Sequence, residues 1–450
     1  MLAQICAVSI FLLMFIIIII NRLPRYIPAL AGGALTILFI FLIIMKSPST
    51  VMHVLNFGEI GQIAFWVPGH KPFESVGVNW QTIIFIAGMM VMVEGLGKVG
   101  FFRWLCLHVA RIVRYKAIAV MVAFTLLAGF LAMFIDSITV LLFFAMITIE
   151  LARLLKFDPV PVIIAEIFAA NVGGSATMAG DPPNIIIGTS LGYHFSDFLA
   201  NTGLIAWIGM IVVLIFFYFV FRNSLKSSAG RINPAPDRYP EPKEAITDQG
   251  RFLTFIAIFL LVVALLITHA QTGMSVALIG VIAAVLTLVF GYKDALHIIR
   301  KVDWQTLLFF FGLFICVAGL EQTGALKTLA DFISRVSGGS LIAVITIILW
   351  VSAFASSIVD NIPFAAAMIP VIKGLAATGL PLPPLAWSLA LGTDIGGNGT
   401  PIGASANVVG IAIAEREGYH ISWGRFLKYA LPAMILVVGI CWLMLIVRYA

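Results

Sequence analysis

The sequence predicts an all-α integral membrane protein. We expect two inverted repeats of five transmembrane helices, each with a re-entrant helical hairpin and one interrupted helix. Three observations support this class: an apolar composition, ten long apolar segments and an internal repeat. The chain is 61% hydrophobic and 11% charged, whereas soluble domains carry about 25% charged residues. The net charge of +6 does not indicate nucleic-acid binding, because the basic residues lie in short loops between apolar segments.

Each half of the chain contains five segments long enough to cross a bilayer. In the first repeat, 1–222, they fall near 3–20, 27–45, 80–97, 160–192 and 202–221. Four prolines and mixed charges mark 223–251 as a linker, which we place in the cytoplasm. In the second repeat, 252–450, they fall near 252–268, 274–290, 304–321, 384–414 and 426–447.

The fourth segment of each half is interrupted by helix breakers. The first break lies in Asn171 to Gly188, NVGGSATMAGDPPNIIIG, and the second in Asp394 to Gly410, DIGGNGTPIGASANVVG. Clustered Gly and Pro cannot continue one helix. Non-helical backbone at membrane depth is tolerated where it faces protein or a wet cavity. Paired interruptions of this kind indicate the substrate site of a secondary transporter.

Two further features lie before each interrupted segment. One is an amphipathic stretch that suits a helix on the membrane interface, Phe101 to Lys116 and Gln322 to Val336. The other is a pair of apolar arms that meet at a polar tip, Asp136-Ser137 or Asp360-Asn361. The arms are 117–134 with 138–155, and 341–355 with 362–377. They form either a re-entrant hairpin or two full crossings, and we favour the hairpin.

The two halves match residue by residue. The segment VNWQT at 78–82 matches VDWQT at 302–306, and the same offset pairs Gly88 with Gly312 and Asp136 with Asp360. After a slip of one residue, the two breaks align, and Asn171 falls on Asp394. An odd number of crossings per half inverts the second half in the membrane.

Basic residues orient the chain. With the N-terminus outside, only six of the 27 Lys and Arg fall outside: Lys46, Lys71, Lys327, Arg335, Lys373 and Arg448. Because cytoplasmic loops carry the excess of basic residues, we expect ten crossings with both termini outside the cell membrane.

Neutral polar side chains gather at the breaks and tips, and we expect them to bind the substrate. They are Ser137, Asn171, Ser175, Thr177, Asn184, Asn361, Asn398, Thr400, Ser405 and Asn407. Hydroxyls, amides and open carbonyls suit a small polyhydroxy solute or a bare cation. We find no Arg or Lys near the breaks in sequence, so a multiply charged anion would lack its usual partner. Helix N-termini alone could still hold a carboxylate.

Four acidic residues are candidates for proton or ion coupling, since ionisable groups at membrane depth are functional candidates by default. Asp136 and Asp360 lie at the hairpin tips, where capping of the second arm is the alternative. Asp181 reads more readily as the cap of a half-helix that begins at Pro182. Asp394 is our first choice, because its repeat partner Asn171 cannot titrate.

The sequence does not indicate an enzyme. The four cysteines are widely spaced, and no zinc, Walker or nucleophile motif is present. We therefore expect no metal site and no cofactor.

Two motifs, GDPPNIIIG at 180–188 and GGNGTPIGASANVV at 396–409, resemble the ArsB/NhaD branch of the ion transporter superfamily. That branch includes arsenite-efflux pumps, sodium/proton antiporters, the melanosomal P protein and plant silicon-efflux carriers. The related dicarboxylate carriers place Ser-Asn-Thr at both tips. Here the tips read Asp-Ser-Ile-Thr and Asp-Asn-Ile-Pro, which speaks against carboxylate transport.

Our leading hypothesis is proton-coupled efflux of arsenite or antimonite by alternating access. The alternative is an Na⁺/H⁺ antiporter of the same family, and a carboxylate carrier or a passive channel is favoured less. The expected partners are the inorganic solute, H⁺ or Na⁺, and the lipid bilayer. The resemblance also implies a soluble ATPase subunit, while association into a homodimer stays open.

Overall fold

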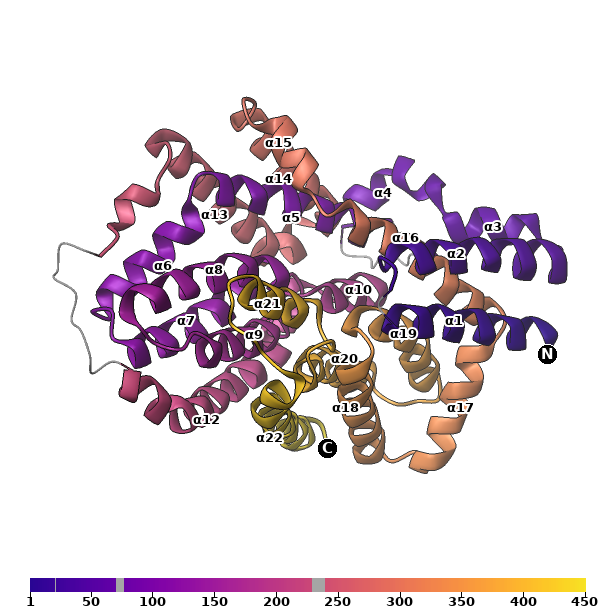
Figure 1. The fold of residues 1–450 in the computed structure, drawn as a ribbon. Helices are drawn as coiled ribbons and strands as arrows, with labels where there is room; N and C mark the ends of the chain where they lie inside the picture. Colours follow the sequence, from indigo (N-terminus) through magenta and orange to yellow (C-terminus); the bar gives the residue numbers. More distant parts are fainter. Residues whose placement is uncertain (21, 70–76, 229–238) are drawn as a thin grey trace.

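The computed structural model describes the whole chain except residues 21, 70–76 and 229–238, and the described part contains helices and loops (Figure 1). The helices up to the linker are α1 (Leu2–Ile20), α2 (Tyr26–Leu35), η1 (Thr36–Ile44), α3 (Pro48–Leu55), η2 (Phe57–Gly61), α4 (Ile63–Trp66), α5 (Trp80–Lys98), α6 (Phe101–Ile112), α7 (Ala117–Ala132), α8 (Ser137–Leu155), α9 (Val160–Gly174), α10 (Pro182–Leu191), α11 (Phe195–Phe198), η3 (Leu199–Gly203) and α12 (Leu204–Ser228).

The second half repeats this order in its central part. Its helices are η5 (Pro242–Ala245), α13 (Gln249–Thr272), α14 (Val276–Phe290), α15 (Ala295–Lys301), α16 (Trp304–Gln322), α17 (Ala325–Ser337), α18 (Leu341–Ile358), α19 (Asn361–Ala377), α20 (Leu382–Gly396), η6 (Gly397–Gly399), α21 (Ser405–Arg416) and α22 (Trp423–Tyr449). The series from α5 to α10 corresponds to the series from α16 to α21.

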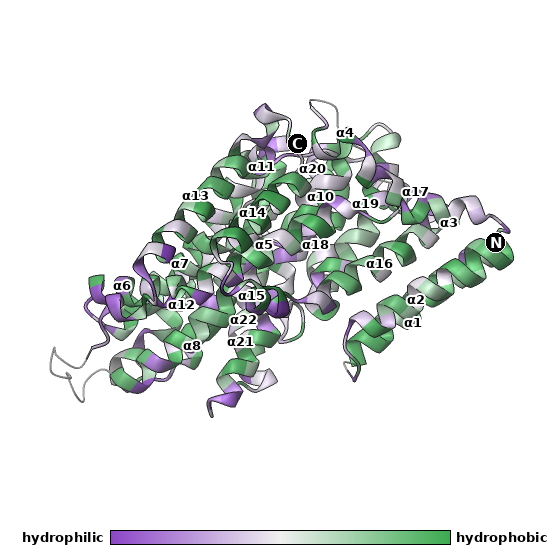
Figure 2. Cartoon of the chain, turned by 90° about the horizontal axis from the view of Figure 1, so that it is seen from above, coloured by the Kyte–Doolittle hydropathy of each residue, from purple (hydrophilic) through white to green (hydrophobic). Residues whose placement is uncertain are grey.

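The helices have the length and surface of membrane helices. Within the described residues, nine are long and apolar enough to cross a bilayer. Seven of them are predicted crossings, and the other two, α8 and α18, are hairpin arms. Large apolar side chains such as Leu12, Phe219 and Leu260 are more than half exposed, and Figure 2 shows hydrophobic residues along α1, α2, α13 and α16. The all-α membrane class is therefore confirmed.

Glycines bring the helices of the two halves close together. On α5, a Cβ added to Gly88 would lie 2.0 Å from the carbonyl oxygen of Gly280 on α14. On α16, a Cβ added to Gly312 would lie 2.4 Å from the backbone of Ala29 on α2. Gly88 and Gly312 are repeat partners, so the same close crossing is built twice.

The breaks and hairpins form where the sequence predicted them. Helix α9 ends at Gly174 and α10 begins at Pro182, while α20 ends at Gly396 and α21 begins at Ser405. These half-helices lie in the middle of the molecule in Figure 1, with α1, α2 and α3 at one end and α6 and α12 at the other. The helices between 48 and 66 were not predicted, because each is eight residues or shorter.

Candidate functional site

In each half, one asparagine joins the two parts of the interrupted helix. Asn184 Nδ2 donates to two backbone carbonyl oxygens of the first break, at 3.0 and 3.1 Å. Asn407 Nδ2 donates to the two equivalent oxygens of the second break, at 2.7 and 2.8 Å. Both side chains are fully buried. The carbonyls that a helix end leaves without partners are thus satisfied in the same way twice.

Threonine hydroxyls attach each break to its own hairpin. Thr177 Oγ1 donates to the carbonyl oxygen of Met133, and Thr400 Oγ1 donates to that of Ser357. These contacts are repeat equivalents. Ser175 does not join the group, because its hydroxyl donates at 2.7 Å to a carbonyl of its own helix.

The two breaks meet at the centre of the molecule. Asn171 Nδ2 approaches Oδ1 of both Asn398 and Asn407, each at 2.9 Å. All three side chains are fully buried. The amides of one half therefore contact those of the other, although more than 220 residues separate them in sequence.

Asp181 collects one donor from each hairpin tip. Its Oδ1 accepts from Ser137 Oγ at 2.8 Å, and its Oδ2 accepts from Asn361 Nδ2 at 2.7 Å. Asp181 lies at the N-cap position of α10, directly before Pro182, as the sequence predicted, but its described side chain makes no capping bond to the helix N-terminus. One side chain from each tip therefore donates a hydrogen bond to one of the two carboxyl oxygens of Asp181.

Asp394 has a different environment from its repeat partner. Its side chain is fully buried and lies beside Asp181, Asn184 and Asn361. Among the described residues, however, neither of its oxygens has a hydrogen bond of ordinary geometry, and neither does Oδ1 of Asn184. In the equivalent pair, Asn171 donates to Asn407. An ionised Asp394 has no proton to donate to Oδ1 of Asn184.

The carboxyl groups at the hairpin tips cap their helices, as one of the two sequence interpretations proposed. Asp136 accepts from the backbone N–H of Thr139 at 2.9 Å and from its hydroxyl at 2.7 Å. Asp360 accepts from the backbone N–H of Ile362 at 3.2 Å. Helix capping and ion binding are compatible roles for these two carboxyl groups.

Arg25 reaches the second tip, contrary to the expectation that no basic side chain lies near the breaks. Its guanidinium forms an ion pair with Asp360 and donates at 2.6 Å to Ser405 Oγ. Ser405 in turn donates to Asp360 at 3.0 Å. The sequence assigned Arg25 to the short loop between the first two crossings. The only signal that could have found it was its place directly before α2, the helix that packs on α16.

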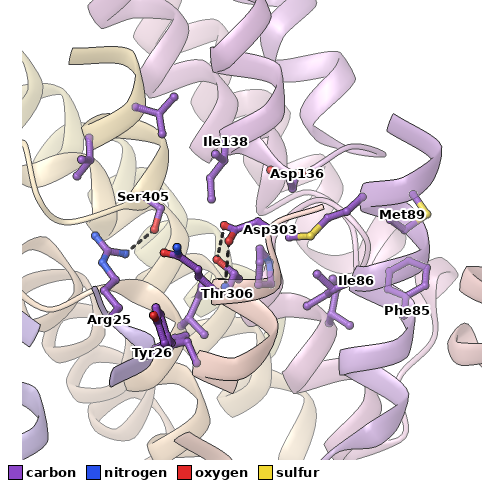
Figure 3. A pocket seen from close by; sticks show the side chains of 18 of the residues that line it. Arg25, Tyr26, Phe85, Ile86, Met89, Asp136, Ile138, Asp303, Thr306 and Ser405 are labelled. Atoms are coloured by element: carbon purple, nitrogen blue, oxygen red, sulfur yellow. Dashed lines mark hydrogen bonds between the residues drawn. The ribbon is translucent and has the colours of Figure 1, made fainter. Parts of the chain in front are cut away.

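A cavity of about 330 Å³ opens beside this ion pair (Figure 3). Its apolar wall includes Phe85, Met89 and Met90, and its polar wall consists of Arg25, Asp136, Asp303, Gln305, Thr306 and Ser405. Of the predicted site residues that the structure describes, only Asp136 and Ser405 line this cavity. The buried amides and Asp394 are not among its lining residues, and the sequence missed Asp303, Gln305 and Thr306.

Comparison with known proteins places the chain among transporters. A family described as "Citrate transporter" matches residues 15–392. An uncharacterized transporter of Mycobacterium tuberculosis is 31% identical over 99% of both chains. The human P protein is 30% identical over 85% of this chain and 55% of its own length. The crystal structure of the Alcanivorax borkumensis YdaH transporter has a TM-score of 0.61 at 14% identity, covering 99% of this chain and 98% of that one, which supports the fold.

Proposed function

The chain belongs to the citrate transporter family, and from that premise we propose that it is a proton-coupled secondary carrier in which Asp394 binds the proton. The environment of Asp394 carries the proposal. A buried charge that lacks hydrogen bonds is costly, and among the described residues neither Asp394 oxygen has a hydrogen bond of ordinary geometry. A proton on Asp394 would supply the missing donor to Oδ1 of Asn184, as Asn171 does for Asn407.

A change of charge at Asp394 would act on both hairpins. Its neighbour Asp181 holds Ser137 of one tip and Asn361 of the other. Two carboxylates side by side repel each other, and a proton on one of them relieves that repulsion. Proton binding therefore favours the arrangement in which both tips stay on Asp181, and proton release loosens it.

We propose arsenite or antimonite as the first solute to test. Four central carboxyl groups, Asp136, Asp181, Asp360 and Asp394, face a single guanidinium, that of Arg25. This balance favours an uncharged or cationic solute over a bare anion. Arsenite near neutral pH is mostly the uncharged trihydroxide, which hydroxyl and amide side chains can bind.

A carboxylate such as citrate is the second candidate. The observation that favours it is Arg25, which lies on the cavity wall and donates to both Asp360 and Ser405. Guanidinium groups bind carboxylates through paired hydrogen bonds, so a substrate carboxylate could replace Asp360 there. The family description also names citrate.

Solute uptake into everted membrane vesicles tests the proposal. Vesicles with and without the protein are given an acidic lumen, and accumulation of arsenite, antimonite and citrate is compared. We expect arsenite to accumulate only while the pH gradient lasts, and a protonophore should abolish accumulation. Vesicles washed free of soluble proteins also test whether an ATPase subunit is needed.

Each other outcome has a definite meaning. Citrate uptake without arsenite uptake would mean that the substrate is a carboxylate and not arsenite. Sodium movement that dissipates the pH gradient without either solute would favour Na⁺/H⁺ exchange. Downhill flux without counterflow would contradict a carrier.

A further inference from the structure

One short sequence occurs twice in the chain, in two different environments. The segment VNWQT begins α5, and VDWQT begins α16. In the first copy Asn79 is 3% exposed and Thr82 is fully buried. In the second copy the equivalent Asp303 is exposed and Thr306 is half-buried. Because four of the five residues are identical, the difference comes from what packs against each copy.

The first copy is bonded to the end of α10. Asn79 Nδ2 donates to Thr189 Oγ1 at 2.8 Å and to Ser190 Oγ at 3.3 Å. The hydroxyls of Thr82 and Thr189 lie 3.0 Å apart. Asn79 Oδ1 also caps α5 by accepting from the backbone N–H of Thr82, which fixes the direction in which its amide points. Four polar side chains thus close the space between α5 and α10.

Within the described part of the chain, the second copy makes no such contact with another helix. Asp303 accepts from the backbone N–H of Thr306 at 3.1 Å and from its hydroxyl at 2.6 Å, so both side chains bond within their own turn. Asp303 and Thr306 instead line the 330 Å³ cavity (Figure 3).

A second, smaller cavity lies at the equivalent place in the other half. Its volume is about 80 Å³, and it is lined by Asn79, Ile186 and Phe314. Their repeat partners Asp303, Val409 and Met90 line the large cavity. Three of the twelve residues that line the smaller cavity thus have repeat partners in the large one, so the smaller cavity overlaps the place where a matching cleft would open.

We propose that Asn79, Thr82, Thr189 and Ser190 form a gate that holds one cleft shut, and that transport exchanges the open and closed clefts. The positions equivalent to Thr189 and Ser190 in α21 are Ala412 and Ile413, which have no side-chain hydroxyl. Closing the other cleft therefore gains no matching hydrogen bonds, and the described arrangement is the resting one. The inference concerns access, so it does not depend on which solute is carried.

Asn79→Asp tests the gate, because a carboxylate keeps the size and the cap but cannot donate to Thr189 or Ser190. Two reporters follow the clefts in protein whose four native cysteines are replaced by alanine. Met90→Cys lies in the open cleft, and Ala318→Cys lies in the closed one, where it is 2% exposed. The rate of modification by a hydrophilic maleimide is measured in lipid nanodiscs, where both faces are accessible.

In the parent protein we expect Met90→Cys to react much faster than Ala318→Cys. Asn79→Asp should raise the rate at Ala318→Cys about fivefold, the equivalent of roughly 1 kcal/mol for the loss of the amide donor, and should lower the rate at Met90→Cys. Thr189→Val should act in the same direction, and Thr189→Ser, which keeps the hydroxyl, should leave both rates unchanged.

Two results would overturn the gate. One is unchanged labelling at both reporters, because the bonds would then not decide which cleft is open. The other is faster labelling at both, which would mean general loosening of the fold rather than exchange. Neither result depends on solute transport, so failure of the gate and failure of the proposed solute can be told apart.

Discussion

At the scale of single residues, the repeat partners Asn171 and Asp394 differ by one side-chain atom. The amide nitrogen of Asn171 donates to Asn407, and the equivalent atom in the other half is an oxygen of Asp394. Asn184, the partner expected from the repeat, therefore keeps an unsatisfied Oδ1 within the described structure. At this pair of positions the two halves can therefore differ by a single proton.

Asp394→Asn should abolish solute accumulation driven by a pH gradient and leave solute exchange intact. The amide keeps the shape of the carboxyl group and can donate permanently to Asn184, so the variant mimics the protonated state. Accumulation and counterflow of the same solute are measured in the same vesicles. Asp331→Asn, at an exposed position on α17, is the control and should behave as the parent. If Asp394→Asn still accumulates solute normally under a pH gradient, the proton-binding residue is Asp136 or Asp360 instead.

At the scale of helices, the site depends on glycine crossings that hold α5 and α16 against α14 and α2. Because a Cβ at Gly88 or Gly312 would meet backbone atoms at 2.0 to 2.4 Å, no rotamer change can make room for it. Backbone shifts at either crossing would move the start of α5 or α16, and with it Asn79 or Asp303.

Gly88→Ala should therefore destabilise the folded protein by about 1–3 kcal/mol, the usual cost of an overpacked core. Gly439→Ala on α22 is the matched control, since a Cβ there meets nothing within 4 Å. Alanine in that helix should be neutral or slightly stabilising, because it has the better helix propensity. Thermal unfolding in detergent compares the two variants. Equal melting temperatures would mean that α5 and α14 can move apart at no cost.

At the scale of the whole molecule, the order of helices repeats from α5–α10 to α16–α21. The domain boundaries at 222 and 252, the inversion of the second half and the orientation in the membrane stay predictions. The orientation decides which side each cleft serves. With both termini outside, the large cavity beside Arg25 opens toward the cytoplasm.

Epitope tags at each terminus and between Thr247 and Asp248 test the orientation. In intact cells, antibodies should reach both terminal tags, and they should reach the linker tag only after permeabilisation. This is expected because most Lys and Arg then lie inside. A linker tag accessible in intact cells would reverse the sides of both clefts, and opposite results at the two termini would contradict an even number of crossings.

The sequence by itself determined the membrane class, the hairpins, the breaks and the match between halves. These features depend on local composition, helix breakers and repeated letters, which are readable without packing. Only the tertiary structure decided that Arg25 pairs with Asp360, and that the carboxyl group of Asp181, at the N-cap position of α10, accepts from both tips. It also decided that Asn79 is buried whereas its repeat partner Asp303 is exposed. Such contacts join residues 44 to 335 positions apart, and near-identical sequences acquire different neighbours because different helices pack against them.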